Sequence, residues 1–111
     1  MMADILSKLG LALHDQGNLE EAIEHFNHAL EIYEVEVGEG SLKAADALNN
    51  LGLLRQDQDE FANAIELFKR VFRICRKVLG NQDLRTREVM DNLAMAYSHL
   101  AKVRKQRWSV H

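Results

Sequence analysis

The sequence predicts an all-α fold in which pairs of antiparallel helices stack on one another. Three observations predict it: the 111 residues include no proline and only 6 glycines, similar segments recur at a fixed interval, and apolar residues recur every three or four positions. Few obligatory chain breaks favour helices joined by short turns. A hydrophobic share of 47% and a charged share of 28% are ordinary for a globular protein and argue against disorder.

The repeat has a period of 42 residues, which is visible in two pairs of similar strings. Leu9-Gly10-Leu11 aligns with Leu51-Gly52-Leu53, and Ala22-Ile23-Glu24 aligns with Ala64-Ile65-Glu66. A period of this length is typical of stacked helical arrays. We therefore expect a single domain over residues 1–111, made of repeat one at 3–44, repeat two at 45–86, and a partial repeat or capping helix at 87–107.

Repeat one is predicted to contain two helices separated by a turn near Gly17. The apolar face of the first helix contains Leu6, Leu9 and Leu13. Gly17 can adopt the left-handed conformation that ends a helix, and Asn18 is expected to cap the next helix, which ends near Gly38. Close approach of the two helices is predicted at the small residues Gly10, Ala22 and Ala29.

Repeat two follows the same plan with one substitution in its turn. Asp59 stands where repeat one has Gly17, and Asp tolerates the left-handed region better than most residues. The first helix should therefore end near Asp59, and the second helix should end near Gly80. The apolar face predicted for the second helix consists of Phe61, Ala64, Ile65, Phe68, Val71, Phe72 and Cys75.

The third unit lacks the turn that the other two units contain. Leu100-Ala101 occupies the expected turn position, and neither residue favours a helix break. We therefore predict one long helix over residues 87–107. Its first half should cover the second helix pair, and its second half should project with the basic residues Lys102, Arg104, Lys105 and Arg107.

Charge is divided unevenly between the two parts of the chain. Residues 1–41 contain nine acidic residues and one basic residue, whereas residues 42–111 contain eight acidic and thirteen basic residues. Such asymmetry indicates interaction with a partner. The single Cys75 cannot form an internal disulfide, and the chain shows neither a signal-peptide pattern nor an uncharged apolar run of about 18 residues. We expect a cytoplasmic protein without a membrane span.

These patterns resemble the tetratricopeptide repeat. The signature positions are filled by Leu6, Leu9-Gly10, Leu13, Ala22, Phe26 and Ala29 in the first unit, and by Leu48, Leu51-Gly52, Arg55, Ala64, Phe68 and Val71 in the second. The 42-residue period, with the string Ala47 to Leu53, is similar to the kinesin-light-chain type of this repeat. The resemblance implies a right-handed superhelical stack of about two and a half repeats that binds proteins, has no enzymatic activity and needs no cofactor.

The resemblance also implies that the first helix of each repeat lines a concave, peptide-binding groove. The groove-facing residues it implies are Asp4, Ser7, Lys8, Leu11 and His14, then Asp46, Asn49, Asn50, Leu53, Gln56 and Asp57, then Glu88, Asp91, Asn92, Met95 and His99. In the family an Asn at the position of Asn50 and Asn92 holds the backbone of an extended peptide, although both amides could simply face water. With Lys8 as the only base in this set, the groove should prefer a neutral or basic, partly apolar peptide.

Self-assembly is the alternative function. The second helix of repeat one is acidic and that of repeat two is basic, so the two helices could pair within one chain or join successive copies head to tail. A symmetric dimer through residues 87–107 is an equally plausible form of self-assembly.

Other signals carry less weight. His25 and His28 have helical spacing for a metal, but no third ligand of matching spacing is evident. The basic run that ends at Trp108 is explained equally well by a solvated helix end, so we do not predict nucleic-acid binding.

Overall fold

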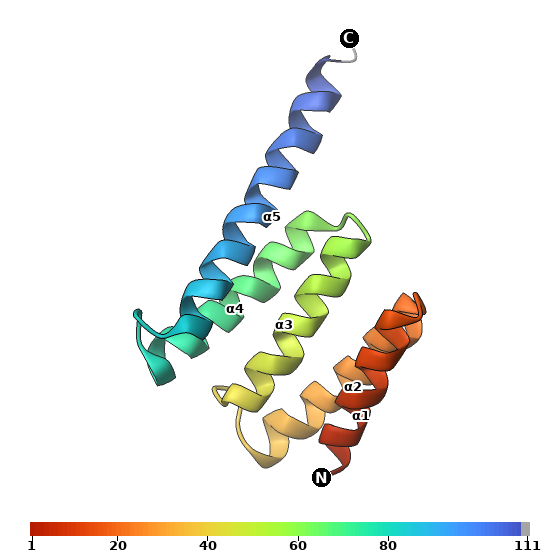
Figure 1. Cartoon of the computed structure of the whole chain (residues 1–111), viewed down its shortest axis with the longest axis vertical. Coiled ribbons are helices and arrows are strands. Elements are labelled where there is room, and N and C mark those ends of the chain that lie inside the picture. Colours follow the sequence, from red (N-terminus) through yellow and green to blue (C-terminus); the bar gives the residue numbers. More distant parts are fainter. Residues whose placement is uncertain (110–111) are drawn as a thin grey trace.

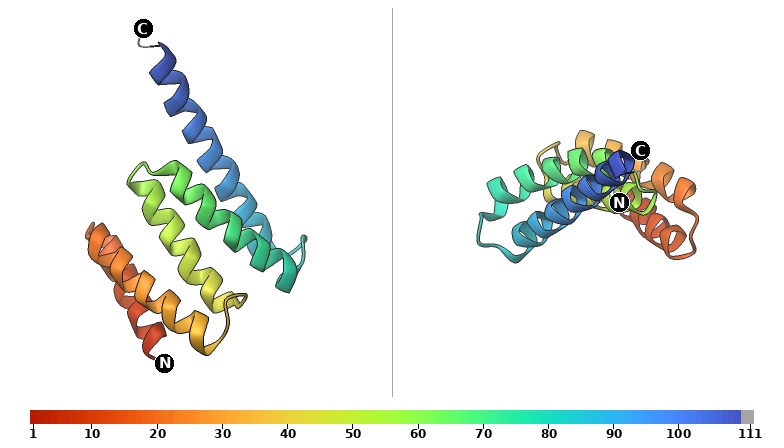
Figure 2. Two further views of the ribbon diagram at one scale, coloured as in Figure 1. Left: turned by 180° about the vertical axis from the view of Figure 1, so that it is seen from behind. Right: turned by 90° about the horizontal axis from the view of Figure 1, so that it is seen from above.

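The computed structural model describes the backbone of residues 1–109 and the side chains of residues 1–107. This part of the chain forms the helices α1 (Met2–Asp15), α2 (Leu19–Glu36), α3 (Leu42–Asp57), α4 (Phe61–Leu79) and α5 (Leu84–Ser109). Each helix packs mainly against its neighbours in the sequence (Figure 1). The helices follow an arc when they are viewed from above (Figure 2), so the predicted all-α stack of antiparallel pairs is confirmed.

The turns within the two helix pairs use left-handed backbone conformations, as the sequence predicted. Gly17 has a φ of 82°, and Asp59 has a φ of 60° at the corresponding position of repeat two. Asn18 occupies the N-cap position of α2 as predicted, but its side chain makes no capping hydrogen bond and its ψ of 71° is not the extended value typical of an N-cap. The backbone N–H of Asn18 instead donates to the Leu13 carbonyl at 2.8 Å, which closes the end of α1.

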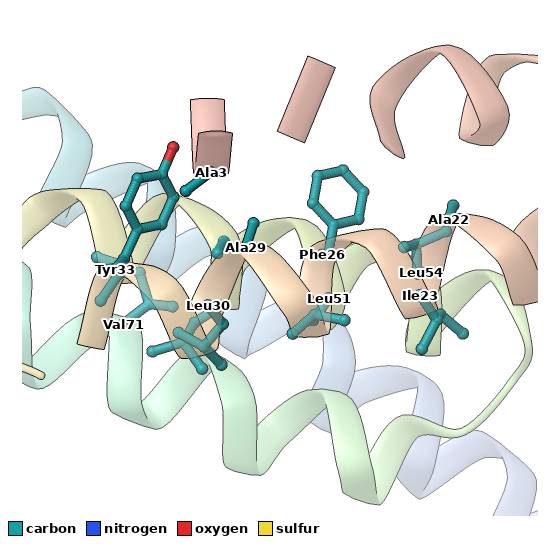
Figure 3. Close-up of a cluster of buried hydrophobic side chains, with 14 of the residues drawn as sticks. Ala3, Ala22, Ile23, Phe26, Ala29, Leu30, Tyr33, Leu51, Leu54 and Val71 are labelled. Atoms are coloured by element: carbon teal, nitrogen blue, oxygen red, sulfur yellow. The ribbon is translucent and has the colours of Figure 1, made fainter. Parts of the chain in front are cut away.

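The two helices of each pair approach closely at one glycine. A Cβ atom added to Gly10 would lie 2.9 Å from the ring of Phe26, and one added to Gly52 would lie 2.6 Å from the ring of Phe68. Both rings are fully buried. Phe26 lies between Ala22 and Ala29 along α2 in the core (Figure 3). These contacts confirm the predicted close approach and explain why the strings around Gly10 and Gly52 recur.

The predicted long C-terminal helix is present as α5, which begins at Leu84 rather than at 87. The earlier start has a local cause, because the Asp83 carboxylate accepts a hydrogen bond from the Arg85 backbone N–H at 2.9 Å. In the same way α3 begins at Leu42, before the predicted boundary at 45, because the Ser41 hydroxyl accepts a hydrogen bond from the Ala44 N–H. The second half of α5 extends beyond the other helices (Figure 1).

Within the part of the chain that the structure describes, no helix combines the length and hydropathy needed to cross a membrane.

Candidate functional site

A cleft of about 490 Å³ lies between α1 and α3. We call it the α1–α3 cleft, and its lining residues are Asp4, Ser7, Lys8, Leu11, Tyr33, Lys43, Asp46, Asn49 and Asn50. Seven of them, all but Tyr33 and Lys43, were predicted from the sequence to face the peptide-binding groove. The cleft therefore brings together the predicted residues of the first two repeats.

Asp4 connects the first three helices at one end of this cleft. The Tyr33 hydroxyl of α2 donates a hydrogen bond to the Asp4 carboxylate, and Lys43 Nζ of α3 lies 3.2 Å from Asp4 Oδ1. The hydrogen bond from Tyr33, followed by the one from Lys43, holds the pKa of Asp4 below its ordinary value. Burial and the bond to Asp4 raise the pKa of Tyr33, and Asp4 raises the pKa of Lys43. All three side chains are therefore held in position by one network.

Asn49 presents a buried oxygen without a partner. Its Oδ1 atom is inaccessible to solvent and accepts no hydrogen bond from any described residue. The neighbouring Asn50 lines the same cleft. An unpaired buried acceptor costs about 1–3 kcal/mol, so turning the Asn49 amide toward the cleft to meet a ligand donor would stabilise this site.

The contact between α3 and α5 repeats the arrangement found between α1 and α3. Arg85 of α5 forms an ion pair with Asp46 of α3, as Lys43 does with Asp4 one repeat earlier. A small cavity of about 70 Å³ lies beside this pair, and its lining includes Asn49, Glu88 and Asn92. Asn92 therefore lies one helix further along the surface on which Asn50 lies.

A larger cleft of about 730 Å³ lies where α5 passes the end of α3. We call it the α3–α5 cleft, and its lining residues are Gln56, Asp57, Asp59, Phe61, His99, Lys102, Val103 and Gln106. The ring centroids of Phe61 and His99 are 5.1 Å apart. Gln56, Asp57 and His99 were predicted from the sequence to face the groove. Phe61 and Asp59 were assigned only to the core and the turn.

Four other predicted residues line none of these clefts. His14 Nε2 lies 2.6 Å from Asp57 Oδ2, so His14 is engaged in a hydrogen bond between α1 and α3. Leu53 is half-buried against the core formed with α4 and α5. Asp91 and Met95 are exposed on α5, with 52% of Met95 accessible to solvent.

Sequence reasoning missed two basic residues of this surface. Lys8 was expected to be the only base of the groove, but Lys43 and Arg85 also belong to first helices of their repeats and lie against its carboxylates. The repeat contained the signal, because Lys43 and Arg85 are 42 residues apart, as Asp4 and Asp46 are. The groove is consequently less acidic than the sequence suggested.

Comparison with known proteins agrees with this architecture. The family described as "Tetratricopeptide repeat" matches residues 1–70 and 43–105. Among curated proteins, none matches the chain. The crystal structure of BtubC (BKLC) from P. vanneervenii superposes with a TM-score of 0.81 at 28% identity, over 87% of this chain and 39% of that one. This chain thus spans less than half the length of BtubC. From the family match and the similar structure together, the chain belongs to the tetratricopeptide-repeat family, and its repeats are of the kinesin-light-chain type.

Proposed function

We propose that the chain is a non-enzymatic scaffold that holds an extended segment of a partner protein against α1, α3 and α5. Tetratricopeptide repeats suggest a protein-interaction scaffold in general. The observation that carries the specific proposal is the α1–α3 cleft, which is lined by the consecutive amide side chains of Asn49 and Asn50. An amide side chain can accept from a peptide N–H and donate to a peptide C=O, which suits it to bind an extended backbone.

The charges and exposed side chains support a neutral to basic, partly apolar segment. Lys43 and Arg85 are engaged with carboxylates, whereas Glu88 and Asp91 form no ion pair with any described residue. Apolar contact is available at Leu11, which is 45% exposed, and at Met95. Complementary charge chiefly raises the association rate and the selectivity, so the affinity should fall as salt rises.

A panel of fluorescent peptides tests this proposal directly. Peptides containing lysine or arginine should bind more tightly than acidic peptides of the same length, and more so at low salt. Replacing Asn50 and Asn92 together by Ala should lower the affinity about thirtyfold, because two hydrogen bonds at about 1 kcal/mol each contribute about 2 kcal/mol together. The control is Asn27→Ala with Asn63→Ala, both exposed on the second helices. Preference for acidic peptides, or equal effects of the two double variants, would contradict the proposal.

Self-assembly is a second candidate, which the exposed face of α5 favours. Met90 of α5 is 50% exposed, whereas Leu48, at the corresponding position of α3, is fully buried. A second copy could cover this face in a symmetric dimer. Head-to-tail assembly has less support. Arg70 of the basic helix α4 lies 3.8 Å from Glu34 of the acidic helix α2 in the same chain, so these two charges already pair within one copy.

Light scattering separates the two candidate functions. A dimer through α5 should dissociate when Met90 and Tyr97 are replaced by Ser, and it should be unaffected by the Asn50 and Asn92 substitutions. Head-to-tail contacts should instead weaken as salt rises. A monomer at every concentration and salt level would exclude self-assembly. The cytoplasmic assignment remains part of the proposal and is supported by the buried thiol of Cys75.

A further inference from the structure

The two contacts between successive first helices are equivalent in sequence but differ in structure. Between α1 and α3, His14 Nε2 lies 2.6 Å from Asp57 Oδ2. A shift of 42 residues places Gln56 on His14 and His99 on Asp57, so Gln56 and His99 are the corresponding pair between α3 and α5. Both Gln56 Oε1 and His99 Nδ1 are buried, yet neither has a hydrogen-bond partner among the described residues. The first contact is closed by a direct bond, whereas no such bond joins Gln56 and His99, and both of these residues line the α3–α5 cleft.

Both unpartnered atoms can accept hydrogen bonds. The amide oxygen of Gln56 is an acceptor, and Nδ1 of His99 accepts when the ring proton is on Nε2. Leaving two such acceptors buried and unpaired costs free energy, whereas a group with two or more N–H donors would satisfy both. The volume of about 730 Å³ is large enough to admit a side chain of a partner rather than water alone.

The other walls of the cleft indicate the charge and shape of that group. Phe61, its neighbour His99, and Val103 provide aromatic and apolar surface, and the carboxylates of Asp57 and Asp59 outnumber the single ammonium of Lys102. Asp57 binds His14 through Oδ2, so its Oδ1 atom is not engaged by His14. An anionic group would meet two carboxylates and two acceptors, so the cleft disfavours it. A cationic group with a flat apolar surface is complementary to these walls.

We propose that the α3–α5 cleft binds an arginine side chain of the partner segment. On binding, the Gln56 amide and the His99 ring turn toward the cleft, so that the guanidinium donates to Gln56 Oε1 and His99 Nδ1. Its plane lies along the Phe61 and His99 rings, and the Asp57 and Asp59 carboxylates balance its charge. A lysine ammonium has fewer donors and no plane to stack, so arginine is selected over lysine. This inference rests on the proposed peptide-binding function and adds the side chain that the surface selects.

Nuclear magnetic resonance titration of the full chain tests the cleft without requiring a whole partner peptide. The probe is the capped tripeptide acetyl-Gly-Arg-Gly-amide, compared with its lysine and citrulline versions; citrulline retains the shape of arginine but is neutral. We expect the arginine peptide to bind at least fivefold more tightly than either, with shifts of the Gln56 amide and the His99 ring. Equal binding of the three peptides, or no shift at these two side chains, would overturn the proposal and leave water as the occupant.

Two substitutions confirm the assignment of the acceptors. Gln56→Met removes the amide oxygen at similar volume, and His99→Phe removes Nδ1 while keeping a ring beside Phe61. Each should weaken binding of the arginine peptide and reduce its preference over the lysine peptide, whereas the exposed controls Gln16→Met and His28→Phe should retain both. Because the wild-type shifts are read independently, misfolding of a variant does not decide the result.

The outcome for the cleft is separable from the outcome for the groove as a whole. The double replacement of Asn50 and Asn92 should leave tripeptide binding unchanged, because neither residue lines the α3–α5 cleft. If extended peptides fail to bind but the arginine tripeptide binds at His99, the scaffold proposal is wrong and the cleft assignment holds. If extended peptides bind with no arginine preference, the cleft assignment is wrong and the scaffold proposal holds.

Discussion

α3 and α5 occupy the same position in successive repeats but have different surroundings. α3 packs against both α2 and α4, and its Leu48, Leu51 and Leu54 are buried. α5 packs mainly against α4, and its Met90 is half exposed although it aligns with Leu48. In a repeat array each unit buries its apolar face only against its neighbours. The comparison shows that the same apolar pattern gives a core helix or a half-covered helix according to what lies beside it.

The largest effect is expected for truncating the aligned apolar residues. Leu48→Ala should lower the free energy of unfolding by about 2–5 kcal/mol, because it leaves a cavity at a fully buried site. Met90→Ala should change it by less than about 0.5 kcal/mol, because half of the side chain already contacts solvent. Urea unfolding followed by circular dichroism measures both. Similar losses in the two variants would mean that the Met90 face is covered in solution, which would point to self-association.

A smaller effect is expected at the position where the helices of each pair approach closely. Gly52→Ala places a Cβ atom 2.6 Å from the buried Phe68 ring. The strain of about 1–3 kcal/mol is partly offset by the higher helix propensity of Ala, of about 1 kcal/mol, so a net loss of about 1 kcal/mol is expected. Ala94 is the aligned residue of α5 and is exposed, so Ala94→Leu should be nearly neutral.

Thermal unfolding distinguishes these two outcomes, because about 1 kcal/mol lowers the midpoint by roughly 4–8 °C in a domain of this size. The matched variant is Gly10→Ala, for which the contact with Phe26 is longer, at 2.9 Å, and the loss should be smaller. An increase in the midpoint for Gly52→Ala would show that the Phe68 ring can move aside.

α3 and α5 also differ at the turn position of the repeat. Asp59 has a φ of 60°, whereas Ala101, the aligned residue of α5, is helical. Asp59→Ala should destabilise the fold by about 1 kcal/mol, because Ala tolerates the left-handed conformation less well. Ala101→Gly should reduce the helical signal by weakening the second half of α5, without moving the urea midpoint of the core. A clear shift of that midpoint would show that the second half of α5 unfolds together with the core.

Much of the fold could be predicted from local sequence, and less of the candidate site. The turn at Asp59 and the continuous helix through Leu100-Ala101 depend on the preferences of one or two residues, which the sequence displays directly. The ion pairs of Lys43 with Asp4 and of Arg85 with Asp46 join residues 39 positions apart. Their distance depends on how far successive helices are offset in the stack, and composition carries no such information. The same holds for the missing hydrogen bonds of Gln56 and His99.

The smallest effect concerns the network that joins α1, α2 and α3, for which α5 offers no equivalent. By the 42-residue shift, Cys75 replaces Tyr33 beside the second ion pair, so only Asp4 accepts a phenol hydrogen bond. The pKa of Asp4 is lowered in the folded protein from the ordinary value of 3.8. A depressed carboxyl pKa contributes stability that is present above the ordinary value and is lost as pH falls through the folded value. The stability difference between wild type and Asp4→Asn should therefore be largest near neutral pH and should vanish in strong acid.

Urea midpoints of the two proteins, measured from about pH 2 to about pH 7, test this dependence. The control repeats the Asp4→Asn comparison in the Tyr33→Phe background. Removing the phenol donor should make the stability difference caused by Asp4→Asn depend less on pH. Since Asp4 lies at a solvent-accessible site, the effect should be small and should decrease with salt. A difference that stays constant across the acid range would mean that Asp4 contributes through packing rather than through its charge, and α1 would then be held to α3 without help from this network.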